Sequence, residues 1–465
     1  MRMKATVALA LGLGVSQLCS AQSIVLIAPQ GTMPPDAPSV QQQPSTGPGQ
    51  SDLNQQPAQP ATRLSIKDAE AIALKSNPSI SAARLNALAS HQVTREARSA
   101  LWPQSYMDLT AVEARDNSRI SAGALNNPII FTRAAAGATV NQLITDFGHT
   151  TNTVASARLH ANAEEQNAVA TKEDILLATD QAFYNTLQTH AVLRVAEQTV
   201  ASRQLLSDQV SALTKSKLKS DLDLSFANVN LAQAKLLYLD ALNNDKSAMA
   251  SLSAILGYPT LQNFEIVDST EQLSPPPADV DQLITEAFAK RPEILSLEFE
   301  AESVEKQHLA NRDEMLPTIS ALGAFGYSPI HDDRMVGPYA AVGVNVQIPV
   351  FNGFLFSARS REAYLRAEAS KQRLSDLRNR ISRDVRTSWL TASTAFDRVN
   401  VSEQLLAQAN LALDLAQTRY KLGLSSIVEL SQAQLQQTQA EIGNAQAQYE
   451  YRFALASLSY QVAGL

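Results

Sequence analysis

Residues that could carry out chemistry are few and scattered. The chain has six histidines: His91, His149, His160, His190, His308 and His331. None stands at metal-ligand spacing from another histidine, and neither a glycine-rich phosphate loop nor a nucleophile elbow occurs. His331-Asp332-Asp333 could suggest a metal site, but it falls between two expected strands, where a solvated loop is the better interpretation. The sequence therefore predicts no enzyme, no cofactor and no metal.

Composition narrows the class further. The chain has 465 residues, a formal charge of -7 and 45% hydrophobic residues, of which few are aromatic. Nucleic-acid binding needs clustered Lys and Arg, so this mild acidity argues against a nucleic-acid partner. Ala, Gln, Leu and Ser recur throughout, a composition that favours long helices packed through small side chains.

The first 21 residues are typical of a secretory signal peptide. Arg2 and Lys4 precede an apolar run, and Cys19-Ser20-Ala21 supplies a small-residue cleavage site after Ala21. The run is shorter than the roughly 20 residues of a spanning helix, which disfavours a membrane anchor. Lipidation of Cys19, the sole cysteine, is also disfavoured but stays open. Residues 22–62 are rich in Pro and Gln and are expected to be a disordered leader.

An internal repeat organises the rest of the chain. The octapeptides ALKSNPSI at 73–80 and AFAKRPEI at 287–294 correspond, and Pro103 and Pro317 are separated by the same 214 positions. Gly148 and Gly353 follow at an offset of 205. We therefore expect two repeats, 63–257 and 280–465, joined by a linker at 258–279 that contains three consecutive prolines.

Each repeat has the same expected order of elements. A helix, at about 66–101 or 280–315, ends before a proline, and two alternating strands follow. The clearest strand has apolar residues at 340, 342, 344, 346 and 348, and the first strands lie near 104–114 and 318–327. Long helices come next, from about 356 to 420 and from 426 to 462, with the first-repeat hairpin turning near 215–221. Helices of this length suit coiled-coil packing.

Four such strands are too few for an independent membrane structure. Strands with one apolar face can cross a bilayer only in a closed barrel, and the smallest outer-membrane barrels have about eight strands. The chain must then oligomerise, and a conducting channel favours three copies or more. Aromatic residues near the strand ends could form an interfacial girdle: Trp102, Tyr106, Phe131, Tyr327, Tyr339 and Phe351.

Three motifs are similar to those of the TolC-like outer-membrane factor family. They are RYKLGLSSIVEL at 419–430, PVFNG at 349–353 and AFAKRPEI at 287–294. The resemblance covers about 64–465. It implies a mainly helical chain with four strands, forming a homotrimer with a twelve-stranded barrel in the outer-membrane lipid above a periplasmic helical tunnel. It also implies two partners, a periplasmic adaptor and an inner-membrane pump. Small-molecule efflux is favoured, protein export remains an alternative, and a periplasmic coiled-coil adaptor is the rival from another class.

The resemblance also implies roles for residues at the hairpin tips. Tyr420 stands at the position of a gating tyrosine, and Glu429 would give a ring of three carboxylates facing the pore, although helix packing and a solvated helix face are the plain alternatives. The adaptor-contacting residues would be Gly423, Leu424, Ser425 and Ser426 in the second tip, and Leu218, Lys219 and Ser220 in the first. The first tip departs from the family because it lacks the glycine and carries three lysines. Ser425 replaces an arginine that some members use to lock the closed state.

Overall fold

Two series of helices with equal lengths make up most of the fold. The computed structural model describes residues 62–115, 132–268, 273–331 and 337–463. The first series is α1 Ile66–Ser76, α2 Pro78–Ser99, α3 His149–Lys215 and α4 Asp221–Ile255, and the second is α5 Val280–Lys290, α6 Pro292–Asp313, α7 Leu355–Lys421 and α8 Ile427–Gln461. In both series the lengths are 11, 22, 67 and 35 residues. The chain is therefore mainly helical, as its sequence predicts.

Some sequence expectations fall on residues outside this description. They are the signal peptide, the leader up to residue 61, Phe131, and the two aspartates of the His331-Asp332-Asp333 loop.

The single helices expected at 66–101 and 280–315 are wrong, because each is two helices separated by one extended residue. Asn77 and Arg291 have ψ angles of 122° and 125°. Each precedes a proline, and the proline ring disfavours the helical conformation of the residue before it. Both proline rings then start the next helix. Asn77 also donates from Nδ2 to the Ile255 carbonyl at 2.9 Å, and Arg291 donates to Gln461 Oε1 at 2.7 Å. The break in each series is thus tied to the end of that series' last helix.

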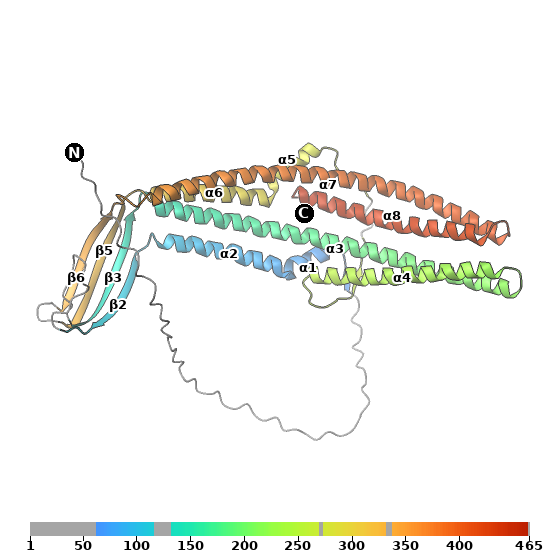
Figure 1. Ribbon diagram of the computed structural model, residues 1–465, viewed down its shortest axis with the longest axis horizontal. Coiled ribbons are helices and arrows are strands. Elements are labelled where there is room, and N and C mark those ends of the chain that lie inside the picture. Colours follow the sequence, from blue (N-terminus) through green and yellow to red (C-terminus); the bar gives the residue numbers. More distant parts are fainter. Residues whose placement is uncertain (1–61, 116–131, 269–272, 332–336, 464–465) are drawn as a thin grey trace, which may run out of the picture. The chain divides into compact units, whose positions relative to one another are not determined.

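Four antiparallel strands form the larger sheet. They are β2 Gln104–Val112, β3 Arg133–Thr145, β5 Thr318–Ile330 and β6 Pro338–Gln347, in the order β2-β3-β5-β6. Each series contributes one β-hairpin, inserted between its 22-residue helix and its 67-residue helix. Figure 1 shows α2 and α6 lying alongside the first parts of α3 and α7.

The long helices pair as two helical hairpins, α3 with α4 and α7 with α8. A 67-residue helix is about 100 Å long at 1.5 Å per residue. Alanine fills many of the buried positions, including Ala161, Ala196, Ala241, Ala392 and Ala447. Small side chains let the helix axes approach closely, which accounts for the alanine-rich composition. Among the described residues, every helix is too short or too polar to cross a membrane.

A short parallel ribbon was not anticipated from the sequence. Strand β1, Thr62–Leu64, pairs with β4, Phe264–Ile266, which lies in the segment expected to be a linker. Leu64 is buried in the cluster that joins α1, α3 and α4. The same segment also contacts the second series, because Trp389 donates from Nε1 to the Pro277 carbonyl at 2.6 Å. The described parts of this segment therefore contact both series, residues 264–266 the first and Pro277 the second.

A buried acid lies where α1 packs against α3. Asp180 is 3% exposed, and its Oδ1 has no hydrogen-bond partner among the described residues. Burial, followed by the charge of Glu70 and a hydrogen bond with it, raises the pKa of Asp180 to about 7. Two carboxyl groups in contact cannot both ionise cheaply, so this pair holds a proton at mildly acidic pH.

This pair makes stability depend on pH. The folded-state pKa of Asp180 lies above its unfolded value, so the folded state binds more protons and stability falls as pH rises towards and through about 7. Asp180→Asn should remove this fall and raise the free energy of unfolding at pH 8 by roughly 1–3 kcal/mol. Thermal unfolding of both proteins at pH 5 and pH 8 measures it. An unchanged pH dependence in the variant would contradict the assignment.

Candidate functional site

The strand register gathers apolar side chains on one face of the four-stranded sheet. Residues paired across neighbouring strands share a face. One row runs Met107, Ala138, Phe325 and Ala340, and the next runs Leu109, Ala136, Tyr327 and Pro338. Val342, Val344 and Val346 extend this face along β6, and Val342 is 92% exposed. The predicted apolar face of one strand thus belongs to an apolar surface across the whole sheet.

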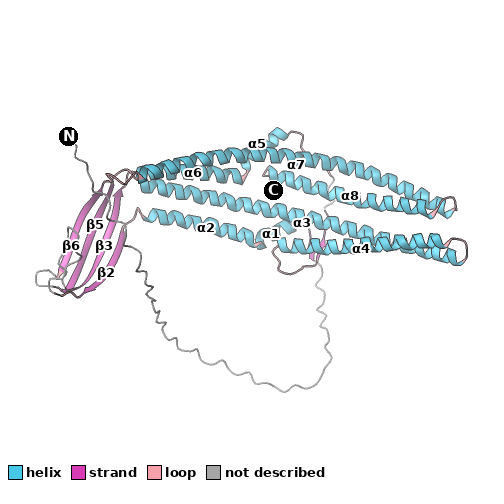
Figure 2. Cartoon of the chain, in the orientation of Figure 1, coloured by secondary structure: helices cyan, strands magenta, loops and turns pink. Residues whose placement is uncertain are grey.

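The opposite face of the sheet is mostly polar. Its rows include Tyr106 with Thr139, Gln104 with Asn141, and Ser320 with Asn345. Leu322 is an apolar exception. Within the described part of the chain, no helix packs extensively on either face, and Figure 2 shows β2, β3, β5 and β6 beyond the ends of the helices. The sheet therefore exposes an apolar and a polar face at once.

Both outer edges of this sheet are open. Among the described residues, β2 pairs only with β3 and β6 pairs only with β5. An open edge presents unpaired N–H and C=O groups to any strand that approaches. A sheet with an exposed apolar face and two open edges therefore lacks both a cover for that face and strand partners for its edges.

The predicted aromatic residues divide between the two ends and the two faces. Trp102 and Phe351 lie outside the strands, at the end that joins the helices, and both are exposed. Tyr327 lies on the apolar face at the opposite end. Tyr106 and Tyr339 lie on the polar face instead. The described residues thus include aromatics near both ends of the sheet, but not all of them share the apolar face.

Tyr339 lies across two glycines of the neighbouring strands. A Cβ on Gly137 would come within 2.0 Å of the Tyr339 hydroxyl, and one on Gly326 within 2.4 Å. Gly326 also faces the Ala136 carbonyl oxygen, at 2.5 Å from such a Cβ. The glycines therefore make room for the ring, which covers the gap that they leave in the polar face.

The two hairpin tips have the same backbone geometry despite their different sequences. Gly423 has a φ of 74°, and Lys217, which lies 206 positions earlier, has a φ of 57°. Ser220 and Ser426 then cap α4 and α8 through their hydroxyls. Leu218 and Leu424 are both exposed. The first tip makes the turn without the expected glycine, by placing a lysine in the left-handed conformation.

Tyr420 is buried between the hairpins. It is 8% exposed and belongs to a cluster with Val210, Ala227, Ile427 and Leu430, drawn from all four long helices. The Lys219 Nζ lies 4.2 Å from the centroid of its ring, a cation–π contact between the two hairpins. Burial, and then the charge of Asp223, raise the pKa of Tyr420, so its hydroxyl stays protonated at neutral pH. In this conformation Tyr420 packs between the helices of the two hairpins, which is the alternative to a gating role.

Glu429 lies on the surface beside this cluster. Its Oε1 is 3.2 Å from Arg419 Nε, and its backbone N–H donates to the Ser426 hydroxyl at 3.3 Å. Ser425 is partly buried, and its Oγ has no partner among the described residues. The sequence predicted Lys219 only as an adaptor contact and did not reveal its contact with Tyr420. The left-handed Lys217 was missed, although the 206-residue offset from Gly423 would have pointed to it.

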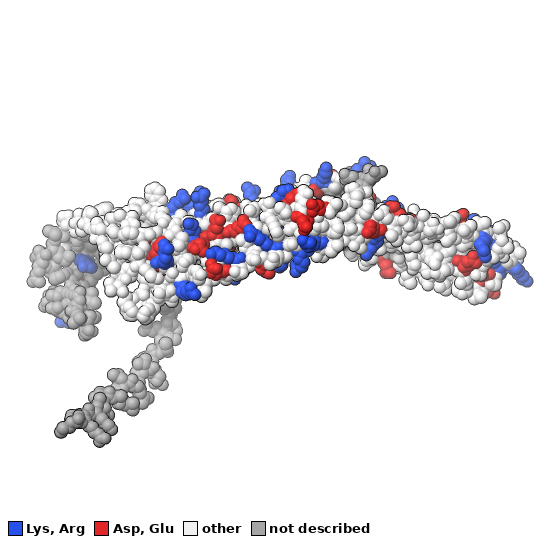
Figure 3. Space-filling model, turned by 90° about the horizontal axis from the view of Figure 1, so that it is seen from above, with Lys and Arg blue, Asp and Glu red and all other residues white. Residues whose placement is uncertain are grey.

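Charged side chains line the contact between α6 and α7. Figure 3 shows acidic and basic groups mixed on one face. Three ion pairs join these helices: Glu298 with Arg378 at 2.7 Å, Glu305 with Lys371 at 3.5 Å, and Glu314 with Arg359 at 3.4 Å. These pairs are mostly exposed, so each contributes little to stability.

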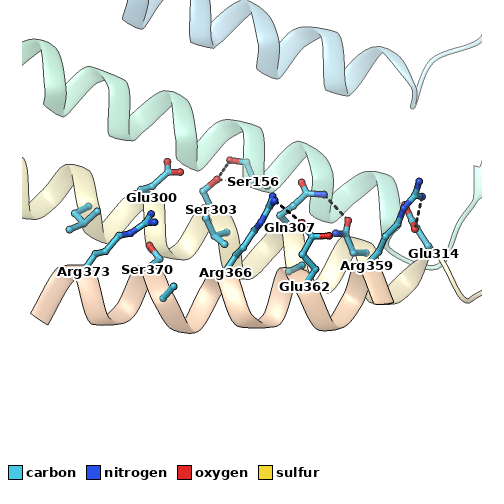
Figure 4. Close-up of a pocket in the computed structure, with 15 residues that line it drawn as sticks. Ser156, Glu300, Ser303, Gln307, Glu314, Arg359, Glu362, Arg366, Ser370 and Arg373 are labelled. Atoms are coloured by element: carbon cyan, nitrogen blue, oxygen red, sulfur yellow. Dashed lines mark hydrogen bonds and ion pairs between the residues drawn. The ribbon is translucent and has the colours of Figure 1, made fainter. Parts of the chain in front are cut away.

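A cavity with a volume of about 720 Å³ lies between α3, α6 and α7. Figure 4 shows Arg359, Arg366 and Arg373 on one side of it. Arg366 pairs with Glu362 at 2.6 Å, and Arg359 pairs with Glu314. The cavity's charges are thus largely neutralised by its own walls. Nowhere in the described ranges do three His, Cys, Asp or Glu side chains gather as metal ligands.

Comparison with known proteins places the chain in a family. The family model described as outer membrane efflux protein matches residues 71–258 and 283–464, so most of the chain is covered. The chain belongs to the outer membrane efflux protein family. This membership confirms the family resemblance found in the sequence, and with it the predicted outer-membrane location.

Individual relatives are distant but match over most of their length. The chain is 23% identical to the outer membrane protein TolC of Escherichia coli over 395 residues, which is 81% of this chain and 77% of TolC. It is 22% identical to the outer membrane efflux protein BepC of Brucella suis, over 69% of this chain and 70% of BepC. The crystal structure of the Campylobacter jejuni CmeC outer membrane channel superposes with a TM-score of 0.75 at 16% identity, covering 86% and 85% of the two chains. At this low identity, the similarity to CmeC shows a shared fold only.

Substitutions at the sheet glycines test the packing of Tyr339. Gly326→Ala should lower the free energy of unfolding by roughly 1–3 kcal/mol, because its Cβ meets a backbone carbonyl that cannot move aside. Gly137→Ala should cost stability in the wild type but much less beside Tyr339→Ala. Gly343→Ala is the matched control, since nothing lies within 4 Å of its Cβ. Thermal unfolding midpoints of the purified proteins compare them, and equal losses at positions 326 and 343 would refute this packing.

Proposed function

We propose that this chain is the subunit of a trimeric exit duct in the outer membrane. Strand β6 of one copy would pair with β2 of the next, which closes a twelve-stranded barrel. The two helical hairpins of each copy would line a periplasmic tunnel below it. The duct would passively conduct small molecules, delivered by a periplasmic adaptor and an inner-membrane pump, and would catalyse no reaction.

The observation that carries this proposal is the apolar face with two open edges. Lipid offers no hydrogen bonds, so strands can span it only when every edge is paired. Association between copies would give the edge strands β2 and β6 their missing strand partners. Membership of the outer membrane efflux protein family supports a location in the membrane. Two copies would give eight strands, a barrel whose interior is filled by side chains, whereas three give twelve and leave room for a channel.

The polar face would then line the channel. Thr139, Asn141 and Asn345 supply the hydrogen-bonding groups that a water-filled lumen requires. The aromatics near both ends, Trp102 and Phe351 at one and Tyr327 at the other, suit the two interfaces of a bilayer. Tyr106 and Tyr339 would face the lumen and are no longer proposed for the girdle.

The two helix series support the proposed repeat. Their equal helix lengths and the separate family matches to 71–258 and 283–464 agree with repeats at 63–257 and 280–465. The segment 258–279 would then act as a packed connector. Residues 1–21 remain the proposed signal peptide, and 22–62 the proposed leader apart from Thr62 in β1.

The hairpin tips would meet the adaptor. Exposed Leu218 and Leu424 would supply apolar contacts, and Gly423, Ser425 and Ser426, with Lys219 and Ser220, would surround them. Tyr420 would hold the two hairpins of one copy together and so narrow the tunnel. In a trimer Glu429 would be repeated three times around the tunnel axis, where a carboxylate ring favours cations.

We favour small molecules as the cargo, because the family description and the name of BepC both contain the word efflux. The exit duct of a type I protein secretion system is the alternative, since one tunnel geometry can serve either pump. A periplasmic adaptor is disfavoured, because the apolar face of the four-stranded sheet would then have no lipid to contact.

Planar-bilayer recordings test the duct and the constriction together. The purified protein should insert and give discrete ionic currents. Tyr420→Ala should raise the single-channel conductance, because it removes a ring that joins the hairpins and its contact with Lys219. Tyr420→Phe keeps the ring and removes only a hydroxyl without a partner in the described residues, so its conductance should match the wild type.

Absence of any current from the wild type would reject the duct itself. A Tyr420→Phe conductance equal to that of Tyr420→Ala would instead keep the duct and reject packing as the role of Tyr420.

A further inference from the structure

A second cavity lies near the hairpin tips, away from the proposed barrel. It has a volume of about 340 Å³, within the usual range of small-molecule sites, and is walled by α3, α7, α8 and the first tip. Leu206, Val210 and Leu430 are among its apolar walls. The cavity therefore joins the two hairpins of one chain.

Two side chains of the cavity wall carry buried polar atoms that lack hydrogen-bond partners among the described residues. They are the Tyr420 hydroxyl and the Gln434 Oε1, on side chains that are 8% and 4% exposed. Leaving one such atom unsatisfied costs roughly 1–3 kcal/mol. Because both side chains belong to the wall of one cavity, a rotation of either would offer its unsatisfied polar atom to a bound ligand.

The charges around the cavity all have one sign. Lys219 and Lys421 line it, and no Asp or Glu is among the described residues that do so. Two acids of the hairpin tips are engaged in other contacts: Asp223 accepts from Ser220 at the start of α4, and Glu429 pairs with Arg419. The site thus combines apolar walls, a cationic side and two hydrogen-bonding groups.

We propose that this cavity binds small amphipathic anions, with an aromatic or aliphatic body against the leucines and a sulfonate, carboxylate or phosphate beside Lys219 and Lys421. The Tyr420 hydroxyl donates to the anion or to a polar atom of its body, and the Gln434 amide supplies the remaining hydrogen bond. Because its walls come from both hairpins, a bound anion holds the tips in the arrangement described here. The site is independent of which cargo the duct carries.

Naphthalene-1-sulfonate is a suitable probe, since it is water-soluble and has the size and charge that the cavity suits. Isothermal titration into the purified, lipid-reconstituted assembly should show saturable binding with one site per chain. 1-Naphthylmethylamine, a cation of similar shape, should bind more weakly. Replacing both cavity lysines, Lys219→Gln with Lys421→Gln, should weaken anion binding about tenfold or more.

Lys215→Gln is the matched control, because it removes the same charge from the end of α3 without lining the cavity. It should bind the probe like the wild type. Leu205→Trp changes no charge and places a large ring at an exposed wall position, so it should block binding even if the lysine variants unfold. Equal binding of the anion and the cation, or equal losses in Lys215→Gln and the double variant, would overturn the proposal. Binding that survives Leu205→Trp would also overturn it.

Discussion

The hydrogen-bonding requirement of the sheet edges is the constraint on which the rest depends. Strands β2 and β6 each leave one row of backbone N–H and C=O groups without a strand partner in the described chain, and the face between them is apolar. Water can satisfy those groups but not the apolar face, and lipid can satisfy the face but not the groups. Edge-to-edge association meets both demands at once. The channel proposal follows from this conflict more directly than from any single residue.

The helices meet a different requirement, because they must extend far from the sheet while burying few large side chains. Alanines at the buried positions of α3, α4, α7 and α8 allow close packing, and ion pairs such as Glu298 with Arg378 link neighbouring helices at the surface. Asn77 and Arg291 bend each short helix pair and tie it to the end of a long one. The tips depend on local chemistry, with a left-handed residue followed by a serine cap in each hairpin.

Much of this fold could be predicted because its signals are local. Alternation at 340–348 identified a strand, and the long helices expected at 356–420 and 426–462 match α7 and α8 to within one residue at each end. The helix breaks at Asn77 and Arg291 were missed because helical periodicity continues across them. The β1–β4 ribbon was missed since three-residue strands carry no pattern and pair across 202 positions. The face on which Tyr339 lies could have been read from the alternation at 340–348. The burial of Tyr420 depends on residues of the other hairpin, which spacing along the chain does not reveal.

Disulfide cross-linking between the two sheet edges tests the central claim most directly. In a chain with Cys19→Ser, one cysteine is placed on β2 within 105–111 and one on β6 within 339–346, and pairs are scanned in intact membranes. The account predicts register-dependent cross-links that need both cysteines and give species of two and three chains, with nothing larger. No cross-link at any pair, or a ladder that continues past three chains, would contradict a sheet that closes with two further copies of itself.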